Sequence, residues 1–133
     1  MVSKGTDFVF GQSIGDVAAF LGIKIDTTPK LSPAEIVGKI KMILAAAQRY
    51  IGQFPQDIAN QDVLDRKRTY RELSFHIFRV VEALLDCAEG RKLTYDYYAD
   101  NPPDKMRDFR DIIVYGEKVS QHLEIWWNKN WDQ

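Results

Sequence analysis

The sequence predicts an all-α protein, an up-down antiparallel helical bundle with three long helices and a short N-terminal helix. Apolar residues recur at spacings of three and four behind three separate helix-start signals. Long helices joined by loops of about a dozen residues favour an antiparallel bundle over an orthogonal globule. The 133 residues, 45% apolar and 28% charged, suit an ordinary globular chain. We expect an N-terminal extension over residues 1–30 and a bundle domain over residues 31–133.

The N-terminal extension carries weaker signals. Residues 7–11, Asp-Phe-Val-Phe-Gly, read as a short extended segment. Residues 13–16, Ser-Ile-Gly-Asp, form a weak capping box before a short helix over 17–21, which Gly22 would close. The stretch 23–29 ends in Thr-Thr-Pro and predicts a linker, because the residue before a proline disfavours helix.

The first long helix is predicted over 33–51. Residues 32–35, Ser-Pro-Ala-Glu, combine a capping box with a proline in the first turn. Gly52 and Pro55 end the helix. Residues 53–68 predict a loop with one helical turn.

The second long helix is predicted over 70–89, between the capping box at 69–72, Thr-Tyr-Arg-Glu, and a left-handed glycine cap at Gly90. Phe75 and Phe78 lie off the main apolar stripe of this helix. That stripe consists of Leu73, Ile77, Val80, Val81, Leu84 and Leu85.

The third long helix is predicted from 103 to about 128. Residues 101–104, Asn-Pro-Pro-Asp, supply an N-cap at Asn101 or a neighbour and two prolines that cannot lie deep in a helix. A heptad-like seam follows, made of Phe109, Ile112, Gly116, Val119, Leu123 and Trp126.

The apolar stripes are wide, so a three-helix monomer would leave part of their surface exposed to water. Monomers rarely expose contiguous apolar patches of several hundred Å². We therefore expect a homodimer or a fourth helix that this sequence lacks. Trp126, Trp127 and Trp131 lie in the last eight residues, where they either anchor the final turn to the core or form an interface.

Only two histidines are present, His76 and His122, each within a predicted helix. Zinc needs three or four protein ligands, and iron of the facial-triad type also needs a carboxylate. The nearby carboxylates Glu72, Glu117 and Glu124 stand at no evident ligand spacing. The residues alone favour two hydrogen-bonded histidines at the edge of the bundle over a complete metal site.

Other reactive groups favour structural roles. Cys87 follows His76 by eleven positions, about 16 Å along a helix, so His76 is too distant to activate the thiol. The basic triplet at 66–68 is typical of a solvated loop, and the tyrosines at 95, 97 and 98 either rim a pocket or cover the end of the bundle.

Composition and charge exclude several classes of binding partner and of cellular location. The net charge of −1 gives no global field to attract nucleic acid or an anionic membrane. A single cysteine excludes an internal disulfide, and no apolar run approaches the roughly 20 residues of a membrane span. The first five residues lack the apolar stretch of a signal peptide. We expect a soluble, cytoplasmic protein.

Residues 68–83, from Arg68 to Ala83, contain Arg-x-Leu-x-x-His-Ile and resemble the second helix of the DinB/YfiT-like family. These four-helix bundles typically hold a divalent metal with one histidine on the second helix and two on the fourth. The resemblance makes His76 the first ligand and extends over about 32–130, including a third helix that ends near Trp126. Residues 8–17 are similar to the tail of a glutaredoxin-like module, without its Cys-x-x-Cys.

The sequence stops at Gln133, where the family would continue into a fourth helix with a histidine pair, so one ligand of three is matched. Either the chain is a shortened relative, or the sequence is a fragment of a longer one. The function we expect is that of a non-catalytic or incomplete DinB/YfiT-like relative acting as a dimeric interaction module. The alternative is a metal-dependent thiol transferase, isomerase or hydrolase that uses His76 to bind zinc, nickel or iron. In a third reading, the chain is an accessory domain once attached to a redox protein.

Overall fold

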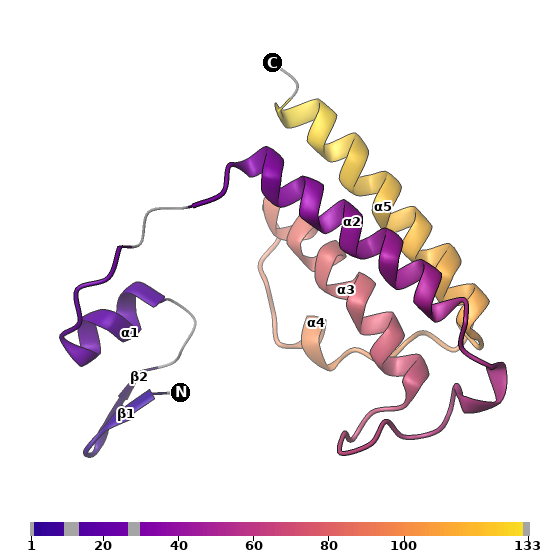
Figure 1. The fold of residues 1–133 in the computed structure, drawn as a ribbon, viewed down its shortest axis with the longest axis horizontal. Coiled ribbons are helices and arrows are strands. Elements are labelled where there is room, and N and C mark those ends of the chain that lie inside the picture. The colour runs from indigo at the N-terminus through magenta and orange to yellow at the C-terminus, as the bar shows by residue number, and fades with distance from the viewer. Residues whose placement is uncertain (1, 10–13, 27–29, 132–133) are drawn as a thin grey trace. The chain divides into compact units, whose positions relative to one another are not determined.

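The computed structural model describes residues 2–9, 14–26 and 30–131. It contains two compact units, Met1–Pro33 and Ala34–Gln133, which we call the N-terminal unit and the helical unit (Figure 1). Each unit is described by itself.

The N-terminal unit contains a hairpin and one helix. Strands β1 (Val2–Lys4) and β2 (Asp7–Val9) pair antiparallel, with Val2 opposite Val9. Gly5 opens the two-residue turn with a φ of 65°, a conformation that favours glycine. The predicted extended segment is confirmed over 7–9, whereas β1 was not anticipated.

Helix α1 (Ile14–Leu21) follows the hairpin and confirms the predicted short helix, starting three residues earlier than expected. Gly22 has a φ of 70° and donates its N–H to Ala19, while Ile23 donates to Ala18, which is a Schellman cap. Ser13 of the predicted capping box and residues 10–11 lie outside the described residues.

The helical unit is built from three long and two short helices in its described part. The predicted first helix is confirmed at 33–51, the second ends one residue early, and one helical turn occurs in the loop as expected. The elements are α2 (Pro33–Ile51), the 3-10 turn η1 (Gln56–Ile58), α3 (Tyr70–Ala88), α4 (Asp96–Ala99) and α5 (Phe109–Trp131). No helix among the described residues has the length and apolarity needed to cross a bilayer.

Both ends of α3 are held as the sequence predicts. The Thr69 hydroxyl accepts the Glu72 N–H, and the Glu72 carboxylate accepts the Thr69 N–H, which completes the capping box. At the other end, Gly90 has a φ of 92° and donates to Cys87, while Arg91 donates to Asp86. These bonds form a Schellman cap and satisfy carbonyls that the helix end leaves free.

The start of α5 differs from the prediction. The helix begins at Phe109 rather than 103, because Asp108 and not Asn101 caps it. The Asp108 carboxylate accepts the Asp111 N–H at 2.8 Å, and the Asp111 carboxylate accepts the Arg107 N–H at 2.9 Å. The two prolines therefore lie in the loop before the helix, where their missing N–H groups disturb no ladder.

One apolar core joins α2, α3 and α5. Phe75 and Phe78 of α3 are buried in it, so the expectation that they lie off the core-facing stripe is wrong. Leu85 of the predicted stripe is buried. Four other members of that stripe are exposed on the opposite side of α3, namely Leu73, Ile77, Val80 and Leu84. The other buried members of the core are Val37, Leu44, Ile51, Ala59, Phe109, Ile112, Val119 and Leu123.

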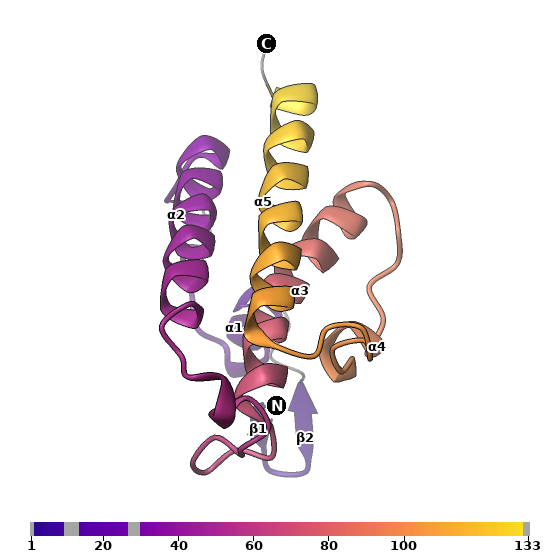
Figure 2. The same cartoon turned by 90° about the vertical axis from the view of Figure 1, so that its right-hand side faces the viewer.

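The directions of the three long helices depart from strict up-down order. Helix α2 runs opposite to α5, but α3 and α5 run in the same direction, as their colours show in Figures 1 and 2. Phe75 stacks on Tyr115, and Glu89, fourteen residues later, contacts His122 further along α5. The connection of 20 residues, 89–108, allows this, because an extended chain of that length can return along the whole of α3.

Candidate functional site

His76, the residue that the family resemblance marks as a metal ligand, lies one and a half turns into α3. Its Nδ1 is buried and makes no hydrogen bond within the described residues. Burial and the nearby Arg68 charge both lower the pKa of His76 below its usual value of 6.5. The imidazole is therefore held neutral, which is the form that binds metal.

The second histidine is not near the first along the helices. His122 Nε2 lies 3.1 Å from a carboxylate oxygen of Glu89, just beyond the end of α3 opposite to the end that carries His76. Across the described ranges, no three His, Cys, Asp or Glu side chains gather where they could hold a metal ion. His76 would therefore need ligands from outside this part of the chain.

The largest exposed apolar feature of α3 is the side turned away from α5. Phe75 and Glu82 contact Tyr115 of α5 and mark the α5-facing side of α3. At 100° per residue, the exposed apolar line lies about 180° from that side. Its members are 37 to 50% exposed: Leu73, Ile77, Val80 and Leu84.

Helix α2 carries a matching line. Ile36, Ile43 and Tyr50 recur every seven residues, each just before a buried core residue, and are 43 to 57% exposed. Lys41 and Gln48, on a different side of α2, hydrogen-bond to side chains of α5. The exposed line of α2 therefore also turns away from α5.

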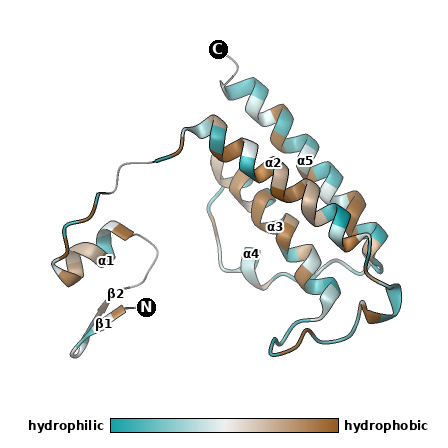
Figure 3. Cartoon of the chain, viewed as in Figure 1, coloured by the Kyte–Doolittle hydropathy of each residue, from teal (hydrophilic) through white to brown (hydrophobic). Residues whose placement is uncertain are grey.

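Together these lines form what we call the α2–α3 face, composed of Ile36, Ile43, Tyr50, Leu73, Ile77, Val80 and Leu84. None of the seven side chains carries a charge. Figure 3 shows α2 and α3 brown over much of their length, whereas α5 mixes teal and white with brown stretches. Exposed apolar patches larger than a few hundred Å² often mark interaction sites.

An apolar hollow of about 280 Å³ continues the face at the end of α3. Val80 and Leu84 form one wall, and Leu93 and Tyr98 of the following loop and α4 form the other. Cys87 is half-buried in the same hollow.

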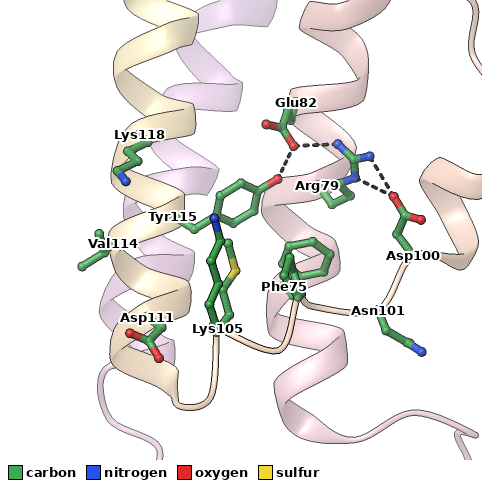
Figure 4. Close-up of a pocket in the computed structure, with 12 residues that line it drawn as sticks. Phe75, Arg79, Glu82, Asp100, Asn101, Lys105, Asp111, Val114, Tyr115 and Lys118 are labelled. Carbon is green, nitrogen blue, oxygen red and sulfur yellow. Dashed lines mark hydrogen bonds and ion pairs between the residues drawn. The ribbon is translucent and has the colours of Figure 1, made fainter.

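A second, polar cavity of about 740 Å³ lies between α3, α5 and the loop that precedes α5 (Figure 4). Arg79 Nη1 donates to Glu82 at 2.6 Å, and Arg79 Nε and Nη2 donate to one oxygen of Asp100 at 3.2 and 2.8 Å. The Tyr115 hydroxyl donates to the same Glu82 oxygen at 2.5 Å. These four side chains join both helices to the loop.

Burial and hydrogen bonds keep both Tyr115 and Arg79 of this cluster protonated. Burial and the hydrogen bond to Glu82 raise the pKa of Tyr115 far above its usual value, so the hydroxyl stays a donor. Burial by itself would lower the pKa of Arg79, but the hydrogen bonds to Asp100 and Glu82 raise it overall. A protonated phenol and a permanent cation are structural connectors here, because neither can take up a proton.

The cluster extends to α4. The guanidinium of Arg79 stacks over the Tyr97 ring at 4.4 Å, and the Tyr97 hydroxyl donates to buried Asp86 at 2.8 Å. Arg68 donates to the Tyr98 carbonyl at 2.5 Å, so one residue of the basic triplet holds α4 in place. Tyr97 therefore covers the flank of α3.

The three tryptophans gather at the end of α5. Trp131 stacks on Trp127 with centroids 5.3 Å apart and lies 5.9 Å from Trp126. Trp126 and Trp127 pack against the core, while Trp131 is 49% exposed. Their role in an interface stays a prediction.

Sequence reasoning singled out His76 and the tryptophans but missed the polar cluster. The apolar spacing does not single out the helix sides on which Arg79, Glu82 and Tyr115 lie. Asp100 comes from a loop, where no periodic pattern exists. The spacing of Arg79 and Glu82 at i and i+3 was the one signal available. The chain matches no family model, no curated protein and no solved structure.

Proposed function

We propose that the helical unit is an interaction module, a non-catalytic or incomplete relative of the DinB/YfiT-like bundles. It associates with a second copy of itself through the α2–α3 face. The observation that carries this proposal is the uncharged apolar line on each of two helices, both turned away from α5. Burial of such side chains contributes about 25 cal/mol per Å², which is the main driving force of association.

The pattern of the face favours a second copy as the occupant. A two-fold axis places residues near the axis against their own copies, so charged side chains there would repel one another. The seven side chains that define the α2–α3 face are uncharged, with Lys39 at the border of the α2 line, and the heptad spacing of Ile36, Ile43 and Tyr50 suits helix-against-helix packing. The resemblance adds support, because a fourth helix completes the bundle in that family.

Analytical ultracentrifugation of the full chain at micromolar concentration tests this proposal. We expect a dimer for the parent protein and monomers for Val80→Glu and Ile43→Glu, since a charge on the face must be desolvated in the dimer. Both residues are exposed, so the variants should keep the helical circular dichroism of the parent.

Ile125→Glu is the matched control. Ile125 is 66% exposed on α5, nine positions from buried Gly116 and therefore on the opposite side of that helix. This variant should remain dimeric. A monomeric parent protein, or a dimer that survives Val80→Glu and Ile43→Glu, would contradict the proposal.

A metal-dependent enzyme of the same family is the second candidate, and the bare Nδ1 of His76 favours it. Its ligand set would be completed by side chains outside the described residues. Metal analysis of the purified protein tests it: stoichiometric zinc, nickel or iron that is lost in His76→Ala supports a metal site. Protein that binds none of the three after incubation with each ion would remove this candidate.

A further inference from the structure

The polar cavity of about 740 Å³ has a volume within the range of small-molecule sites. It lies on the helical unit between α3, α5 and the preceding loop, and no residue of the α2–α3 face lines it. An inference about this cavity therefore goes beyond the proposed interaction module.

Formal charge alone does not select a ligand for the cavity. Its lining holds three cationic and three anionic side chains: Arg79, Lys105, Lys118, Glu82, Asp100 and Asp111. The selection depends on which of these groups still have hydrogen-bonding capacity to offer.

Each acidic group is engaged through one of its two oxygens. Glu82 accepts from both Arg79 and Tyr115, and Asp100 accepts two N–H groups of Arg79. Asp111 accepts the N–H groups of the two residues before α5. These bonds also use the Arg79 guanidinium toward Glu82 and Asp100, so the cluster largely satisfies itself.

The two lysines differ from the other charged groups. Neither Lys105 nor Lys118 has a hydrogen bond or ion pair within the residues that the structure describes. In Figure 4, Lys105 extends from the loop in the direction of Tyr115, and Lys118 lies above Val114 on the same side of α5. Two ammonium groups with free donors at one cavity call for acceptor atoms on the ligand.

Apart from Asn101 and the Tyr115 hydroxyl, the rest of the lining is apolar. Phe75 and Tyr115 stack with their centroids 5.2 Å apart and an angle of 26° between the ring planes. Met106 and Val114 add apolar surface to the same cavity. Such a wall binds a hydrocarbon or aromatic body but contributes nothing to an inorganic ion.

We infer that this cavity binds a small organic carboxylate, whose acidic group pairs with Lys105 and Lys118 and whose apolar body lies against Phe75 and Tyr115. The Arg79–Glu82–Asp100 cluster positions Tyr115 by holding its hydroxyl. Ammonium–carboxylate pairs are stronger than neutral hydrogen bonds, so the lysines supply the selection for an anion.

Isothermal titration of the full chain with matched probes tests the inference. Benzoate and hexanoate represent the carboxylates, while benzamide and benzylamine present a similar body without a negative charge. We expect saturable 1:1 binding of at least one carboxylate, at least about tenfold tighter than either uncharged or cationic probe. Inorganic phosphate should bind more weakly than the better carboxylate, because it has no apolar body.

The variants Lys105→Gln and Lys118→Gln should each weaken that binding by about fivefold to tenfold, and Lys129→Gln should leave it unchanged. All three lysines are exposed, so the fold should tolerate each change. The inference is overturned by benzylamine binding as tightly as benzoate, by unaltered affinity in the Lys105 and Lys118 variants, or by no saturable carboxylate binding at millimolar concentrations.

Discussion

The ring of Phe78 occupies the space above Gly116, where a Cβ would lie 2.6 Å from two ring carbons. The side chain of Phe78 is fully buried, and it reaches this position because residue 116 has no side chain of its own. A glycine inside a helix costs about 0.5–1 kcal/mol relative to alanine. In α5 that cost is offset by the burial of a whole aromatic ring between two helices.

Replacement of this glycine should destabilise the helical unit. We expect Gly116→Ala to lower the free energy of unfolding by about 1–3 kcal/mol, because the new methyl group must push back a packed ring. Urea unfolding followed by circular dichroism measures the effect.

Gly38→Ala provides the control within α2, since a Cβ at residue 38 would meet no atom within 4 Å. It should raise the free energy of unfolding by about 0.5–1 kcal/mol. If both substitutions changed the free energy of unfolding equally, the packing of Phe78 would not depend on the absence of a side chain at residue 116.

The same pair of residues shows where sequence reasoning succeeded and where it failed. The spacing of the α5 seam predicted correctly that Gly116 is buried. The pattern of α3 could not identify its core side, because apolar residues occur almost all around this helix. The core side of α3 is set by a tertiary contact, in which Phe78 fills the space that Gly116 leaves open on α5.

The hydroxyl of Tyr115 gives the second prediction. Tyr115→Phe removes its bond to Glu82 but leaves Glu82 paired with Arg79, so no carboxylate is left bare. We expect a loss of about 1–1.5 kcal/mol in the free energy of unfolding, as for one hydrogen bond. Tyr95→Phe, at a side chain that is 80% exposed, should change stability by less than about 0.5 kcal/mol in the same urea titration.

The capping box of α3 gives the third prediction. Thr69→Ala removes the acceptor of the Glu72 N–H and should lower the unfolding free energy by about 0.5–2 kcal/mol. Thr69→Ser keeps the oxygen and should retain most of the parent stability. If thermal unfolding places the two variants at the same midpoint, the hydroxyl contributes nothing.

Local signals of this kind explain why the helix boundaries were largely predictable while the polar cavity was not. A capping box and a left-handed glycine act within a few residues, so Thr69 and Gly90 could be read directly. The cavity depends on Tyr115 reaching Glu82, 33 residues earlier, and on Asp100 returning to Arg79 across 21. These pairs form only because the long connection brings α5 back parallel to α3, and no local pattern records that path.

His76 gives the fourth prediction, through the pH dependence of stability. Its pKa in the folded protein is below the usual 6.5, owing to burial and to the charge of Arg68. Below pH 6.5 the unfolded chain therefore binds a proton that the folded protein takes up only at lower pH. By linkage, the contribution of His76 to stability is complete above pH 6.5 and declines as the pH falls toward the folded pKa.

His76→Gln removes this titration and keeps a polar side chain of similar size. Urea unfolding of both proteins, from about pH 7.5 down to about pH 5, isolates the effect as the difference between two stability curves. We expect the parent protein to lose more stability than the variant over this range, with most of the difference arising below pH 6.5. Curves that stay parallel would show that the imidazole titrates alike in both states, and a steeper decline in the variant would reverse the sign assigned to its burial.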